Sequence, residues 1–303
     1  MSEQGTGGQL KTYLMERLRL VETALDRYLP QVGTLPASLH ESMRYSVFAG
    51  GKRIRPILML AACETVGGDL QQALPAACAV EMIHCYSLIH DDLPVMDDDD
   101  LRRGKPTNHK VYGEDIAILA GDGLLTEAFI LLSNPDFAEL LAARTRNEVI
   151  HLLAKSAGSL GMVGGQVVDM ESEGKEIDLP TLEYIHSHKT GALMLASIEC
   201  GAVIGGASPE QRKALVRYGQ AAGLAFQIAD DILDIVADQD VLGKDIGSDQ
   251  ERSKATYPAL LGLGESRQRA RELRDIALTA LDSFGASAQP LRDIAGYIVD
   301  RSF

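Results

Sequence analysis

Apolar residues recur three and four positions apart over much of this chain, which is the spacing of an amphipathic or buried α-helix. The pattern is clearest over residues 10–28, 138–157, 211–234 and 266–284. Alternating runs of β-branched and aromatic residues are scarce, and no segment joins such runs through the turn residues of a hairpin. The pattern therefore predicts an all-α fold without β-hairpins.

Helix-breaking residues divide the chain into segments of helical length. The breaks fall at residues 31–36, 66–69, 133–136, 172–180, 205–209, 238–249 and 285–290. They predict roughly ten or more helices joined by mostly short loops. No break is long or polar enough for an interdomain linker, and no repeat of fixed period is present. We therefore expect one large bundle of helices, a single domain over residues 1–303.

The composition is acidic, with 29 Lys and Arg against 43 Asp and Glu among 303 residues and a formal net charge of −14. No basic run interrupts this background, so a nucleic-acid partner is not expected. The four cysteines lack CxxC spacing and have apolar neighbours, which predicts free thiols in a reducing compartment. The N-terminus lacks a signal-peptide pattern, and the apolar run 191–197 stops at Glu199. We expect a cytoplasmic protein without stable membrane insertion.

Two aspartate runs stand out from this pattern. The first follows an apolar helix, starts at Asp91 and Asp92, and continues with consecutive aspartates from Asp97. The second lies in a predicted helix, where polar residues at i, i+3, i+4 and i+7 share one face: Gln227, Asp230, Asp231 and Asp234. Stacked carboxylates repel unless a cation lies between them, and their oxygens suit magnesium, which typically completes its shell with water and phosphate. The runs predict a magnesium site for a phosphorylated ligand.

Either run alone is also compatible with a solvated acidic surface. The surroundings favour the metal site, because Asp230 and Asp231 lie within the largely apolar stretch 221–235. Arg102 and Arg103 follow the first run after a single leucine, and this change of charge suits a metal and a phosphate bound side by side.

Basic residues near these runs suit a diphosphate ligand. In the motif GGKRIRP, Lys52 and Arg55 are spaced one helical turn apart, and the P-loop spacing is absent. Their side chains, rather than a backbone cradle, would hold the phosphates, with a solvated basic turn as the alternative. Lys189 enters an apolar helix, where a buried ammonium needs an anionic partner.

Three further residues are weaker candidates. Lys244 and Lys254 belong to a Gly- and Asp-rich segment that is equally typical of an ordinary charged loop. His84 precedes Asp91 by two helical turns and can share its face, although a lone histidine on an apolar helix is more often a core residue.

Taken together, the motifs resemble those of trans-isoprenyl diphosphate synthases, specifically bacterial-type farnesyl or geranylgeranyl diphosphate synthases. The resemblance covers almost the whole chain and rests on ordered motifs: GGKRIRP from Gly50, EMIHCYSLIHDDLPVMDDDDLRRGKPTNH from Glu81, GGQVVDM from Gly164, HKTGAL from His188, FQIADDILD from Phe226 and GKDIGSDQERSKATYPALLG from Gly243. It implies mainly antiparallel helices around a central cavity, and a homodimer.

The resemblance also implies roles for individual residues. Metal ions, three of magnesium or alternatively manganese, would be held by Asp91, Asp92, Asp97, Asp230, Asp231 and Asp234. The allylic diphosphate would be bound by Arg102, Lys189, Thr190, Gln227, Lys244 and Lys254. Isopentenyl diphosphate would be bound by Lys52, Arg55, His84 and Arg103. The catalytic group would be Asp91, Lys189, Thr190, Gln227 and Asp230, with the oxygens of Thr190 and Gln227 facing the developing cation.

Product length depends, by the same resemblance, on the residues four and five positions before Asp91, which are Ser87 and Tyr86. A bulky ring at Tyr86 would stop the growing chain early. Together with the inserted Leu93 and Pro94, it favours farnesyl diphosphate over geranylgeranyl diphosphate. Two further alternatives are a helical metal phosphohydrolase, for which His90 and Asp91 are a superficial match, and a non-catalytic subunit, which would be expected to lose residues that this chain keeps.

Overall fold

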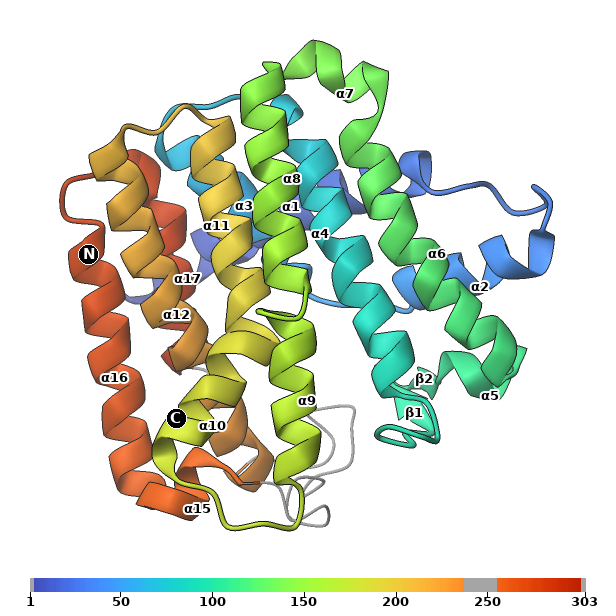
Figure 1. Ribbon diagram of the computed structural model, residues 1–303. Coiled ribbons are helices and arrows are strands. Elements are labelled where there is room, and N and C mark those ends of the chain that lie inside the picture. Colours follow the sequence, from blue (N-terminus) through green and yellow to red (C-terminus); the bar gives the residue numbers. More distant parts are fainter. Residues whose placement is uncertain (1–2, 237–254, 301–303) are drawn as a thin grey trace.

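Helices make up nearly all the regular structure of the computed structural model, which describes residues 3–236 and 255–300 (Figure 1). The first half contains α1 (Glu3–Tyr28), α2 (Ala37–Val47), α3 (Ile54–Thr65), α4 (Leu70–Asp91), α5 (Asn108–Tyr112), α6 (Glu114–Ser133), α7 (Pro135–Leu140) and α8 (Ala143–Ala157). The second half contains α9 (Met162–Ser172), α10 (Leu179–Ile185), the π-helical turn η1 (His186–Gly191), α11 (Ala192–Ile204), α12 (Pro209–Val236), α15 (Tyr257–Leu261), α16 (Leu263–Ala280), the 3₁₀ turn η2 (Ala286–Ala288) and α17 (Gln289–Asp300). The predicted all-α fold is confirmed.

Three helices that are buried along most of their length form the middle of the bundle. α3, α4 and α11 are buried along most of their length, because their apolar residues are not confined to one stripe. Gly201 of α11 lets this helix approach α3 closely, since a Cβ there would lie 2.1 Å from the carbonyl oxygen of Met59. These helices form the centre against which the others pack.

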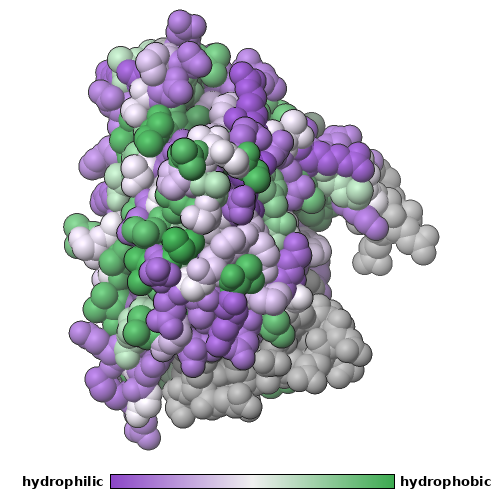
Figure 2. Space-filling model, turned by 90° about the vertical axis from the view of Figure 1, so that its right-hand side faces the viewer, coloured by the Kyte–Doolittle hydropathy of each residue, from purple (hydrophilic) through white to green (hydrophobic). Residues whose placement is uncertain are grey.

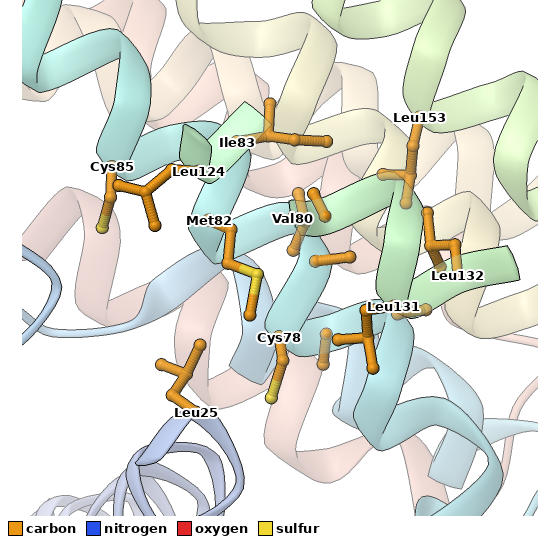
Figure 3. Packing of buried hydrophobic residues seen from close by; sticks show 14 of the residues in the cluster. Leu25, Cys78, Val80, Met82, Ile83, Cys85, Leu124, Leu131, Leu132 and Leu153 are labelled. Carbon is orange, nitrogen blue, oxygen red and sulfur yellow. The ribbon is translucent and has the colours of Figure 1, made fainter. Parts of the chain in front are cut away.

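Two clusters of buried side chains make up the core. In the first, side chains from α1, α4, α6 and α8 converge, among them Leu25, Met82, Leu124 and Leu153 (Figure 3). The second lies around α12, α16 and α17 and includes the fully buried Tyr218. α3 and α11 contribute to both clusters. This sharing supports the single domain over residues 1–303, which stays a prediction. The four cysteines are free and buried, as expected.

Two local predictions were wrong. Residues 138–157 do not form one helix, because α7 starts at Pro135 behind the Asn134 cap and the chain then becomes extended at Leu141, whose buried side chain packs into the core. A short hairpin is also present: β1 (Leu101–Arg102) pairs with β2 (Lys105–Pro106) through a turn at Arg103 and Gly104. Both turn residues have positive φ, as a two-residue hairpin turn requires. Strands of two residues are too short to show alternation.

α6 was not recognised as an unusually apolar helix. It is the one helix of the described residues that is long and apolar enough to cross a membrane by length and composition, and 39% of the tested window is buried. It packs against α4 as part of the first core cluster. Cytoplasmic location and the absence of stable membrane insertion stay predictions.

The two aspartate runs lie at the same end of the bundle. α4 and α12 both run from the top toward the bottom of the view in Figure 1, so the Asp91 end of α4 and the Asp230 region of α12 point the same way. η1 lies between α10 and α11 and contacts both α9 and α12. The parts of the candidate site thus come from elements far apart in the sequence.

Candidate active site

The first aspartate run folds back on the end of α4. The backbone N–H of Asp97 donates to the carbonyl oxygen of Asp91 at 2.8 Å, and Leu93 is buried beneath this turn. Burial raises the pKa of Asp91 to about 6; the charge of Lys189 lowers it and that of Asp97 raises it. Asp91, Asp97 and Lys189 therefore belong to one electrostatic site, although they come from two distant segments.

Asp92 points into a different environment. Its side chain is buried, and its Oδ1 accepts a hydrogen bond from Nε of Arg102 at 2.9 Å. The same guanidinium donates to Oδ2 of Asp99 at 3.0 Å. The structure thus gives Asp92 an ion pair that anchors the hairpin and holds Arg102 beside the aspartate run. Asp92 as a metal ligand stays a prediction.

The hairpin also touches the GGKRIRP loop. Arg103 donates a hydrogen bond to the carbonyl oxygen of Gly50 and covers Gly51. A Cβ at Gly51 would lie 2.6 Å from Cζ of Arg103, and its φ of +133° is one that L side chains rarely adopt, so only glycine fits here. The two basic motifs, far apart in sequence, meet at this contact.

The spacing argument for Lys52 was wrong. α3 begins only at Ile54, because Arg53 adopts a left-handed conformation with φ of 49°, so Lys52 is not one helical turn from Arg55. Lys52 is exposed, with its Nζ 6.0 Å from the ring centroid of Tyr297. The spacing of Lys52 and Arg55 could not reveal the left-handed turn at Arg53 between them.

A residue without a predicted role holds this loop in place. The buried guanidinium of Arg53 donates to Oε1 of Glu81 in α4 at 2.8 Å and to the carbonyl oxygen of Val47. Glu81 is 1% exposed and Arg53 is 2% exposed. A buried charge without a partner is costly, so each of these two residues needs the other. The ion pair therefore holds the loop against α4.

Arg55 and His84 lie close to this pair. Burial lowers the pKa of Arg55, while the charges of Glu81 and Asp230 raise it. Its buried Nε has no hydrogen-bond partner among the described residues. Burial also lowers the pKa of His84 well below its ordinary value, and the nearby Arg55 and Arg103 lower it further. The structure therefore brings Arg55, His84 and Arg103 together.

Lys189 has the anionic partner that its position demands. Its Nζ donates to Oδ2 of Asp169 in α9 at 2.6 Å. Burial opposes its charge, but Asp169, Asp91 and Asp97 together raise its pKa. Asp169 belongs to the GGQVVDM motif and received no role in the sequence analysis. The motif itself was the available signal, since an aspartate in an otherwise apolar helix needs a partner.

The second aspartate run does not present one uniform face. Oδ2 of Asp231 accepts hydrogen bonds from Nε2 of His186 at 3.0 Å and from the backbone N–H of Tyr257 at 2.9 Å. Asp230, by contrast, acts electrostatically on Arg55. Neighbouring residues of a helix point about 100° apart, so the carboxylates of Asp230 and Asp231 face different parts of the protein. Asp231 as a metal ligand stays a prediction.

The other predicted site residues are located as follows. Asp234 is 5% exposed, and its Oδ1 has no hydrogen-bond partner among the described residues. Thr190 in η1 and Gln227 in α12 are half-buried. Lys244 and Lys254 lie outside the described residues.

The predicted chain-length residues lie in the last turns of α4. Tyr86 is 7% exposed and belongs to the first core cluster, with its ring edge-on to His90 at 5.7 Å. The hydroxyl of Ser87 donates to the carbonyl oxygen of His84 at 2.9 Å. His90 itself reaches Ile118 of α6, with its Nε2 3.0 Å from that carbonyl oxygen. His90 therefore links the end of α4 to α6.

Comparison with known proteins identifies the family of this chain. The family model for polyprenyl synthetases matches residues 36–284. The chain belongs to the polyprenyl synthetase family. A farnesyl diphosphate synthase of Geobacillus stearothermophilus is 54% identical over 260 residues, covering 86% of this chain and 87% of the relative. A geranylgeranyl diphosphate synthase of Cyanophora paradoxa is 49% identical over 305 residues, covering 98% of each.

A solved structure extends the likeness to the fold. The apo structure of an FPP/GFPP synthase from Zymomonas mobilis aligns with a TM-score of 0.86 and 41% identity, covering 96% of this chain and 99% of that one. The predicted membership in the trans-isoprenyl diphosphate synthases is thus confirmed, and this polyprenyl synthetase is a prenyltransferase.

The acidic residues of this polyprenyl synthetase fit a metal that is shared with a ligand. Among residues 3–236 and 255–300, no three His, Cys, Asp or Glu side chains converge closely enough to hold an ion by themselves. Asp91 is nevertheless desolvated beside Asp97, and Asp234 keeps a buried oxygen that has no hydrogen-bond partner within residues 3–236 and 255–300. All these donors are carboxylate oxygens, which suit a hard divalent cation completed by phosphate oxygens and water. The residues therefore fit magnesium bound together with a diphosphate.

Proposed function

We propose that this protein condenses an allylic diphosphate with isopentenyl diphosphate and that farnesyl diphosphate is its main product. The observation that carries the proposal is the meeting of Asp91, Asp97 and Lys189 at one end of the bundle, beside a second basic group formed by Arg55, His84 and Arg103. The acidic group with Lys189 suits a metal-bound diphosphate that departs from the allylic carbon. The basic group suits the diphosphate of the second substrate, which stays attached to its carbon chain. Two such sites are what a condensation of two diphosphates requires.

Magnesium would be held by Asp91 and Asp97 on one side and by Asp230 and Asp234 on the other. When bound, the metal supplies positive charge to the oxygens of the departing diphosphate. Lys189 adds a fixed ammonium at the same place, held by Asp169 at 2.6 Å. Charge that is already oriented in a water-poor site stabilises the departing diphosphate more than the same charge in water, because no solvent has to reorganise.

The second group binds isopentenyl diphosphate. Arg55 keeps a buried Nε free of hydrogen bonds among the described residues, and the ring of His84 can donate a further hydrogen bond to the phosphate. The allylic cation that forms must not meet water, and the oxygens of Thr190 and Gln227 would face it. The double bond of isopentenyl diphosphate can then add to the cation, and the new cation loses a proton to the departed diphosphate, so no nucleophilic side chain is needed.

The product assignment rests on Tyr86. Its ring is buried against His90, five residues before Asp91 and therefore roughly 7.5 Å along the helix axis. A bulky side chain at this depth limits the room for a growing chain. The named relatives include both farnesyl and geranylgeranyl diphosphate synthases, so their names do not decide the length.

The test is a product assay with purified protein, magnesium, labelled isopentenyl diphosphate and either dimethylallyl or geranyl diphosphate, with products separated by chain length. The proposal predicts mainly the fifteen-carbon product and none after chelation of the metal. Mainly twenty-carbon product would contradict the Tyr86 argument and leave the reaction class standing. Pyrophosphate release that does not depend on isopentenyl diphosphate would contradict the reaction class.

A homodimer through α6 is part of the proposal. Ile118, Leu119 and Ile130 are between 45% and 53% exposed on this helix. Figure 2, which views the right-hand side of Figure 1, shows exposed hydrophobic residues scattered among hydrophilic ones. Acidic residues, among them Glu114 and Asp122, are exposed on the same helix, which disfavours an anionic membrane surface. A second copy of the chain is therefore the occupant that we propose for this apolar face.

Light scattering tests the dimer. Wild type should have the mass of two chains, and the double variant Ile118→Asp with Leu119→Asp should have the mass of one. Leu160→Asp is the matched control, because Leu160 is 76% exposed and lies outside α6. A monomeric wild type, or a double variant that stays dimeric, would rule out this interface.

A further inference from the structure

A buried polar network joins the elements on either side of the candidate site. His186 starts the π-helical turn η1, and its Nε2 lies 3.0 Å from Oδ2 of Asp231 in α12. The same oxygen accepts the backbone N–H of Tyr257, the first residue of α15, at 2.9 Å. His186 is 8% exposed and Asp231 is 7% exposed. Because Oδ2 accepts a bond here, the ring carries its proton on Nε2.

Tyr257 contacts two further members of this network. The ring of Tyr257 stacks on that of His186, with centroids 5.7 Å apart and planes inclined by 15°. Its hydroxyl donates to Oε1 of Glu183 in α10 at 2.7 Å. α10, η1, α12 and α15 are thus held together by one group of side chains, which fixes how η1 is rotated against α12.

This rotation matters because η1 and α12 carry different parts of the site. η1 carries Lys189, which faces Asp91 and Asp169, and α12 carries Asp230 on the side of Arg55. A π-helical turn is rare and weakly hydrogen-bonded, so it persists only when its surroundings hold it. α9 holds it from one side, where a Cβ on Gly165 would lie 2.2 Å from the backbone nitrogen of Lys189.

We propose that His186 and Asp231 are positioning residues whose hydrogen bond sets the distance and direction between Lys189 and Asp230. Asp231 then contributes through its oxygen as an acceptor, not through metal coordination. This inference rests on the proposed function for the identity of the ligand, an organic diphosphate with a divalent cation. The network itself stands on the contacts alone.

Paired variants separate positioning from packing. His186→Phe keeps a ring to stack on Tyr257 and removes the donor, and His186→Gln restores an N–H at similar reach. We expect His186→Phe to lower kcat by about 10- to 100-fold with KM for isopentenyl diphosphate changed less than about twofold, and His186→Gln to recover most of the loss. His188→Phe is the matched control, because His188 lies in the same turn but its contacts among the described residues are local, with Ser187 and Tyr184.

Asp231 gives the second comparison. Asp231→Asn keeps an oxygen that can accept both bonds, and Asp231→Leu does not. Positioning predicts a much smaller loss for Asp231→Asn than for Asp231→Leu, whereas metal coordination predicts large losses for both. Equal losses in the two variants would therefore overturn the proposal. So would a His186→Phe variant with wild-type kcat, or one no worse than His188→Phe.

A binding measurement provides a readout apart from turnover. Calorimetric titration of inorganic pyrophosphate with magnesium should show affinity lowered by about tenfold or more in His186→Phe and unchanged in His188→Phe. If wild type made no prenyl product, the proposed function would fail, and this titration would still decide the positioning claim. If His186→Phe did not fold, the comparison of Asp231→Asn with Asp231→Leu, together with His186→Gln, would decide it.

Discussion

The ion pair between Arg53 and Glu81 gives the sharpest stability prediction. Glu81→Gln keeps the shape of the side chain and removes its charge, which leaves the guanidinium of Arg53 buried without its close partner. Removing one partner of a buried pair costs about 3–5 kcal/mol. Glu22 also lies 3.6 Å from Arg53, and Val47 still accepts a hydrogen bond, so we expect the lower end, about 3 kcal/mol.

The same guanidinium supplies a matched control. The side chain of Glu22 is 41% exposed, so its attraction to Arg53 is screened by water and Glu22→Gln should cost less than about 1 kcal/mol. At roughly 2 °C per kcal/mol for a chain of this size, Glu81→Gln should lower Tm by about 6 °C.

Urea unfolding at one fixed protein concentration measures both variants, since a dimer would make stability depend on concentration. Equal losses for Glu22→Gln and Glu81→Gln, or a loss below about 1 kcal/mol for Glu81→Gln, would refute the reasoning. Because Arg53 lies between Lys52 and Arg55, we also expect Glu81→Gln to raise KM for isopentenyl diphosphate more than KM for the allylic substrate.

Three further variants test other parts of the site. Tyr86→Ala should lengthen the product beyond fifteen carbons in the chain-length assay, and an unchanged product would count against the ring as the limit. Gly165→Ala should cost about 1–3 kcal/mol of stability and lower kcat, because its Cβ would collide with the backbone of Lys189, whereas Gly264→Ala, with nothing within 4 Å, should do neither. Burial raises the pKa of Asp91 from 3.8 to about 6, so the metal-free folded protein loses stability as pH rises through that window. Asp91→Asn should therefore raise Tm at pH 7 in chelator while abolishing product formation; a lower Tm would contradict the burial argument.

The helical fold was predictable because apolar spacing persists over long segments. Periodicity of this kind survives small local irregularities, and α12 and α16 were both expected close to where they occur. The break at Leu141 was not predictable, since one buried leucine redirects the chain without any helix-breaking residue. The hairpin at Arg103 and Gly104 was not predictable either, because strands of two residues are too short to show an alternating pattern.

The site residues were predictable as types but not as partners. Aspartates and lysines in apolar surroundings indicate a functional site. Which of them pair, however, depends on how helices distant in the sequence pack, and the sequence alone does not show this. Asp231 looked equivalent to Asp230 until the structure showed it bonded to His186 and Tyr257. Asp169 had no assigned role, and it is the closest partner of Lys189.

A crystal structure of the protein with magnesium and inorganic pyrophosphate tests the central claim most directly. The account predicts metal ions that join one pyrophosphate to Asp91 and Asp97 on α4 and its following turn, and to Asp230 and Asp234 on α12, with Lys189 contacting the same phosphates. Pyrophosphate held by only one of these acidic groups, with the other turned toward solvent, would contradict it.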